Sequence, residues 1–98
     1  MAANTETDQI RAALATVPTS FPGHPRVVET RFKLGSDEAG DPAVFVVVLL
    51  DENTSDADWT SPKLEPIAER FRAALDDAGI ARWPYVRFAR PSDYRAAG

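Results

Sequence analysis

The segment AVFVVVLL, residues 43–50, places eight apolar residues in a row and constrains the fold more than any other part of the chain. It is far shorter than the roughly 20 residues that a membrane-spanning helix requires. We interpret it as a strand that is apolar on both faces. Such strands normally belong to sheets that are covered on both sides. The segment therefore predicts a strand whose two faces both need a partner layer.

Two other segments have the apolar spacing of helices that pack with one side on a core. Residues 6–17 follow Thr5, a suitable N-cap, and carry apolar side chains at i, i+4 and i+7. Residues 62–78 repeat apolar positions at steps of three and four, ahead of Gly79 as a C-cap. We expect an amphipathic helix over each segment.

Strands are predicted over residues 26–34 and 85–90, where apolar and polar residues alternate. The side chains expected to face the core are Val28, Thr30, Phe32 and Leu34 in the first segment, and Val86 and Phe88 in the second. Those expected on the other face are Val27, Glu29, Arg31 and Lys33, followed by Tyr85, Arg87 and Ala89.

The elements follow one another in the order α-β-β-α-β. A strand–helix–strand crossover is right-handed, which places both helices on the same side of the sheet. The sequence therefore predicts an α+β two-layer sandwich, with a three-stranded sheet and two helices on one face. Its 98 residues fit a single domain, 1–98, in which we expect residues 1–5 and 91–98 to be flexible.

This predicted fold leaves one sheet face without a second layer. An apolar stripe with charged residues around it is typical of an interaction surface. A second copy of the chain or another protein would cover that stripe. The alternative is that the long stems of Arg and Lys shield it. The predicted interface residues are Val44, Val46, Val48, Leu50, Val27, Arg31, Tyr85 and Arg87.

Acidic residues follow the apolar strand directly. The span 36–58 contains seven acids and no Lys or Arg, although the whole chain has a net charge of −4. Such a block suits electrostatic attraction of a basic partner. The candidate partner contacts are Asp51, Glu52, Asp56 and Asp58. Residues 51–59 lack the regular ligand alternation and the turn glycine of a calcium loop, so no metal site is predicted.

The last strand has the opposite charge. Residues 81–95 interleave four arginines with Trp83, Tyr85, Phe88 and Tyr94, a pattern that can stack single-stranded bases. The order of elements from residue 27 through residue 94 resembles the KH-like domain of the ribosome-binding factor A family. That resemblance implies RNA or ribosome binding as an alternative function. The chain departs from the family in having one helix between its last strands and no G-x-x-G loop, and its net acidity argues against nucleic acid.

No group of residues points to catalysis. There is no cysteine, and the single histidine, His24, lies in the proline-rich segment FPGHPR without a nucleophile elbow or a phosphate-binding glycine loop. We therefore predict no catalytic residue and no cofactor. The preferred interpretation is a small, non-enzymatic protein–protein interaction module of the cytoplasm, such as an antitoxin-like or accessory subunit. A metal-dependent enzyme that uses the 51–58 loop is the remaining alternative.

Overall fold

The computed structural model describes residues 5–97 and confirms the predicted fold class. The flexibility expected for residues 1–4 and for residue 98 concerns positions outside the described residues. The elements are α1 (Thr5–Ala15), β1 (Val27–Ser36), β2 (Pro42–Leu50), the 3-10 turn η1 (Asp56–Asp58), α2 (Ser61–Asp77), β3 (Trp83–Ala89) and α3 (Pro91–Ala97).

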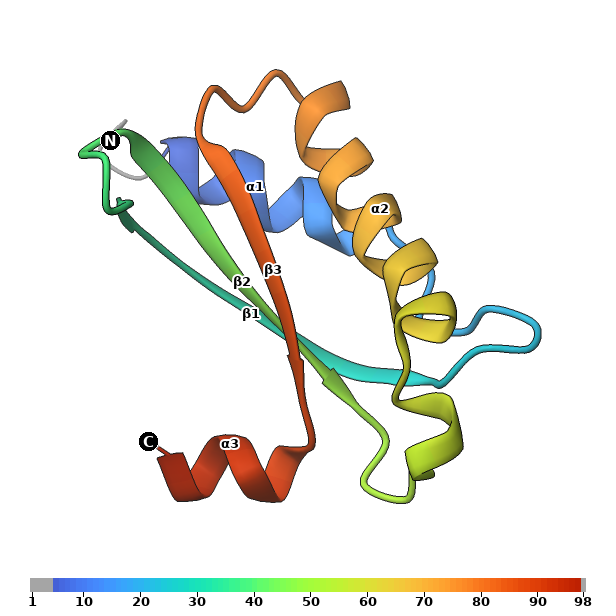
Figure 1. Cartoon of the computed structure of the whole chain (residues 1–98). Coiled ribbons are helices and arrows are strands. Elements are labelled where there is room, and N and C mark those ends of the chain that lie inside the picture. Colours follow the sequence, from blue (N-terminus) through green and yellow to red (C-terminus); the bar gives the residue numbers. More distant parts are fainter. Residues whose placement is uncertain (1–4, 98) are drawn as a thin grey trace.

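The sheet has the strand order β1-β2-β3, with the apolar strand β2 in the centre. β2 pairs antiparallel with β1 through a short hairpin and parallel with β3 through the α2 crossover. Figure 1 shows α1 and α2 on the same side of the sheet, as the handedness of the crossover predicted.

The main core lies between this sheet face and the two helices. It takes one alternate set of β2 side chains, Val44, Val46, Val48 and Leu50, which are at most 1% exposed. Ile10 and Leu14 of α1 pack against them, as do Ile67, Phe71 and Leu75 of α2.

The prediction that these four β2 residues line the uncovered face was therefore wrong. Alternation cannot identify the inward set in a strand that is apolar at every position. The register with neighbouring strands decides the question, because Val46 lies between Phe32 of β1 and Val86 of β3. Both of those partners face the helices, as predicted, and Val46 must share their side of the sheet.

A β-bulge at the start of β1 also reverses the predicted faces of Val27 and Val28. Val27 pairs with Leu50 and Glu29 with Leu49, so Val28 is an extra residue without a partner on β2. A slip of one residue moves a side chain to the opposite face. Val27 is consequently buried in the main core, whereas Val28 is 45% exposed.

The other face of the sheet has a partial cover of its own, α3. Its Tyr94 packs against Val47, Leu49 and Ala89, a second and smaller apolar cluster. The sequence predicted no element after β3, only a flexible tail. The helix forms because Pro91 suits a first helical position and Tyr94 supplies an apolar anchor. In Figure 1, α3 lies away from α1 and α2, beyond the carboxyl end of β3.

Because the two sheet faces are covered unequally, removing an aromatic ring should lower the free energy of unfolding by different amounts on the two faces. Phe71→Ala leaves a cavity in the main core and should lower the free energy of unfolding by about 3–5 kcal/mol. Phe45→Ala, at a half-buried ring on the other face, should cost clearly less. Urea denaturation of both variants measures the difference. An equal or larger loss for Phe45→Ala would contradict the described arrangement of the two faces.

Candidate interaction surface

The part of the second sheet face that α3 leaves uncovered is the candidate site, and we call it the open face. Strand register places its side chains in three rows across the sheet. The rows are Gly35, Ala43 and Trp83; Lys33, Phe45 and Tyr85; and, at the border with α3, Arg31, Val47 and Arg87, where Tyr94 covers Val47.

Aromatic rings form the centre of the open face. The rings of Phe45 and Tyr85 stack with their centroids 5.5 Å apart. Gly35 makes room for this pair, since a Cβ atom there would lie 3.3 Å from the Phe45 ring. Trp83 is 63% exposed and Tyr85 40% exposed. The centre of the face thus presents apolar surface to solvent.

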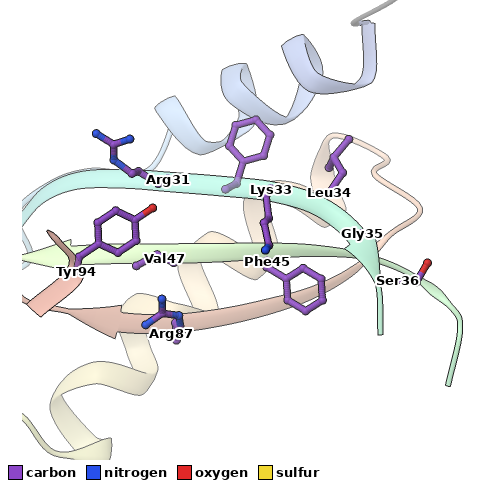
Figure 2. Close-up of a pocket in the computed structure, with 10 residues that line it drawn as sticks. Arg31, Lys33, Leu34, Gly35, Ser36, Phe45, Val47, Arg87 and Tyr94 are labelled. Atoms are coloured by element: carbon purple, nitrogen blue, oxygen red, sulfur yellow. The ribbon is translucent and has the colours of Figure 1, made fainter. Parts of the chain in front are cut away.

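A groove with three cations lies on one side of Phe45. Arg31, Lys33, Arg87 and Tyr94 line it above Val47, and its volume is about 690 Å³. Figure 2 shows Phe45, Arg87 and Tyr94 around this groove. We call it the cationic groove.

The three cations of the groove differ in their partners. Arg31 makes an ion pair with Glu29 at 2.8 Å and lies 5.7 Å from the centre of the Tyr94 ring. Lys33 and Arg87 are exposed, and neither forms an ion pair or side-chain hydrogen bond with any residue in the described part of the chain. Two positive charges of the groove therefore remain uncompensated.

An acidic hollow of about 620 Å³ lies on the other side of Phe45, at the tip of the β1–β2 hairpin. Its central carboxylate, Asp37, accepts hydrogen bonds from the backbone N–H groups of Ala39 and Asp41 and from the Tyr85 hydroxyl, each at 3.0 Å. The tip turns at Gly40, whose φ of +84° favours glycine. Glu38 and Asp41 are exposed beside it.

These hydrogen bonds shift two pKa values. The backbone N–H of Asp41, with smaller contributions from Tyr85 and the other turn amides, lowers the pKa of Asp37. The hydrogen bond to the Asp37 carboxylate, with the nearby negative charges of Asp41 and Glu38, raises the pKa of Tyr85. The hairpin tip is thus an anionic end of the open face.

The predicted interface residues separate into two groups. Arg31, Tyr85 and Arg87 lie on the open face, whereas Val27, Val44, Val46, Val48 and Leu50 are buried in the main core. Sequence reasoning missed Phe45 as a member of the surface, assigned Lys33 to this face without naming it as an interface residue, and named Trp83 only as a base-stacking candidate. Assigning the even-numbered residues of β2 to the core would have placed Phe45 on the open face, since it lies between Lys33 and Tyr85.

The acidic loop 51–58 makes several contacts within the chain. Glu52 accepts hydrogen bonds from the hydroxyl and the backbone N–H of Ser92, at 2.6 and 2.9 Å, and so holds the start of α3. Asp51 accepts from the backbone N–H of Asn53, and Asp56 lies 3.5 Å from Arg90. Contact of Asp51, Glu52, Asp56 and Asp58 with a partner stays a prediction.

Two of the four C-terminal arginines serve the fold. Arg90 lies over the Trp59 ring, 4.5 Å from its centre, and donates to the Thr54 carbonyl at 2.7 Å. Arg82 pairs with Glu6 and also donates to the backbone carbonyls of Gly35 and Ala43. Neither lines the cationic groove.

His24 contacts the backbone of α2. Its Nδ1 lies 2.9 Å from the carbonyl oxygen of Lys63, which can only accept, so this nitrogen carries the proton. Lys63 in turn donates to the carbonyl of Gly23. Within residues 5–97, no three His, Cys, Asp or Glu side chains gather closely enough to hold a metal ion. None of the helices in that same range is long and apolar enough to cross a membrane.

Comparison with known proteins leaves the open face as the basis for the functional argument. No protein-family model matches the chain, and no significant match was found to a curated protein or to a solved structure.

The contact between Glu52 and Ser92 predicts a pH-dependent stability. The Ser92 hydroxyl and N–H, with help from Arg95 and Arg90, lower the pKa of Glu52 below its ordinary value of 4.5. A group with a lowered pKa in the folded state contributes stability above its unfolded pKa and loses it as pH falls through the folded pKa. Wild type should melt above Glu52→Gln at pH 7, and the difference should shrink on acidification through and below pH 4.5.

Asp58→Asn is the matched control, because it removes a carboxylate of the same loop that forms no hydrogen bond or ion pair with the described side chains of α3. Melting curves followed by circular dichroism measure both variants. A gap between wild type and Glu52→Gln that stays constant across this pH range would refute the role of the Glu52 carboxylate.

Proposed function

We propose that this chain is a cytoplasmic protein–protein interaction module that docks its partner through the open face. The observation that carries the proposal is the exposed aromatic centre at Phe45, Tyr85 and Trp83, which has uncompensated charges on both sides. Aromatic residues and arginine are enriched where protein partners bind most strongly. An apolar centre with a charged border is the usual composition of such interfaces.

The antitoxin-like or accessory-subunit form of this proposal needs acids that are free to meet a basic partner. β2 separates the acids of residues 36–58 into two sets, one at the hairpin tip and one in the 51–58 loop. The tip offers the exposed Glu38 and Asp41 beside the aromatic centre. The tip acids support partner docking better than the loop acids, of which Glu52 and Asp56 already contact Ser92 and Arg90.

Binding of single-stranded nucleic acid is the second candidate, because Lys33, Arg87 and Tyr85 share one sheet face. Two features oppose it. The rings of Phe45 and Tyr85 stack on each other, which leaves fewer free ring faces for bases. The acids of the hairpin tip also lie beside Tyr85, where they repel a uniformly charged phosphate backbone.

Site-specific photo-crosslinking in the native host tests partner docking. A benzophenone amino acid at Trp83, an exposed position on the open face, should form a discrete covalent adduct with a protein on irradiation. The matched control carries the same group at Asp76, which is exposed on α2, the helix that covers the opposite sheet face. Adducts at both positions, or at neither, would argue against docking through the open face.

Fluorescence anisotropy tests the second candidate. We expect labelled oligouridine to show no saturable binding at physiological salt. Binding that weakens with salt and is lost on Arg87→Ala would favour nucleic acid over protein. Arg26→Ala removes an exposed arginine before β1 and controls for the lost charge.

A further inference from the structure

We infer that the partner of the open face is a second copy of this chain, packed face to face about a twofold axis near Phe45 and Tyr85. This inference rests on the proposed function, since it names the partner of that same surface. The argument begins with the distribution of charge along the face.

The open face is bipolar. The cationic groove and the acidic hollow lie on opposite sides of Phe45, which lines both. The groove holds the uncompensated cations Lys33 and Arg87, and the hairpin tip holds the exposed acids Glu38 and Asp41. Two unpaired charges of each sign are therefore separated by an aromatic centre.

Such a bipolar face is complementary to itself. In a twofold dimer, each residue i that contacts residue j is matched by j contacting i. An axis that lies in the interface, through the aromatic centre and perpendicular to the line from groove to hairpin tip, places the cationic groove of each copy over the hairpin tip of the other. The Phe45–Tyr85 pairs of the two copies then meet at the axis and are removed from water. No other protein has to be supplied to neutralise the face.

The two edges of the sheet are less suited to association than the open face. β1 and β3 are the two edge strands of the sheet. β3 contains Pro84, which has no N–H to donate, and β1 contains the bulge at Val28. Both features are known devices that prevent edge-to-edge pairing. Association is thereby directed to the face. On that face, α3 marks the boundary of the interface, because Tyr94 already covers Leu49 and Ala89.

Light scattering coupled to size exclusion, with sedimentation velocity, tests the dimer. At low ionic strength we expect twice the chain mass of 10.7 kDa. The dimer should weaken in about 1 M salt, where charges are screened beyond roughly 3 Å. Arg87→Glu and Asp41→Lys each create like-charge contacts at both junctions of the dimer. Each should raise the dissociation constant about tenfold or more.

An equimolar mixture of the two variants gives the decisive result. In a mixed dimer one junction joins the new Glu to the new Lys, and the other retains the native Arg87 and Asp41. The mixture should therefore regain dimer that neither variant forms alone. Arg26→Glu is the control, since it changes the charge equally at an exposed position before β1 and should leave the dimer intact. Circular dichroism establishes that every variant is folded.

The outcomes separate this inference from the proposed function. A wild type that is monomeric at all concentrations, a dimer that both reversals leave unchanged, or folded variants whose mixture stays monomeric would each overturn the twofold arrangement. A monomer that crosslinks a different protein from Trp83 would overturn the dimer and leave the interaction module standing. Absence of any adduct together with a monomer would overturn both.

Discussion

The burial of β2 on both faces is the constraint on which the rest of the structure depends. An all-apolar central strand forces the chain to build two covers, and 98 residues provide them unequally. α1 and α2 form a full layer over Val44, Val46 and Val48. On the other face, Tyr94 of α3 packs against Val47 and Leu49, while Phe45 depends on its neighbours Tyr85 and Gly35. The open face is the part of this second sheet face that α3 does not cover.

The acidic loop and α3 determine where that surface ends. Glu52 holds Ser92 at the start of the helix, and Arg90, just before α3, contacts Thr54 of the loop and the ring of Trp59. These contacts hold α3 where Tyr94 reaches Val47. The sequence suggests that the loop carboxylates form a binding site, but within the structure Glu52 serves to hold α3 in place. The surface they help to delimit lies at the other end of the strand, where the hairpin tip carries its own acids.

Sequence patterns predicted the elements that have a clear period. Both amphipathic helices, the inward side chains Phe32 and Leu34 of β1, and those of β3 were found where alternation or helical spacing identifies them. Alternation could not identify the inward side chains of β2, because the two faces of that strand are equally apolar. It also failed where one residue is added without any signal, at the Val28 bulge. α3 depends on contacts with Glu52, 40 residues away, which local reasoning cannot supply.

The parallel pairing of β2 with β3 has a consequence for the order of assembly. The β1–β2 hairpin joins strands that are adjacent in sequence, whereas β3 reaches its place only after the chain has passed through α2. Contacts between distant residues form late, because closing the intervening loop costs entropy. Lys33 and the hairpin acids are thus in position early, and Arg87, Tyr85 and Trp83 arrive with the last strand. The residues of the open face therefore come together only when β3 pairs with β2, after the rest of the chain has taken its place.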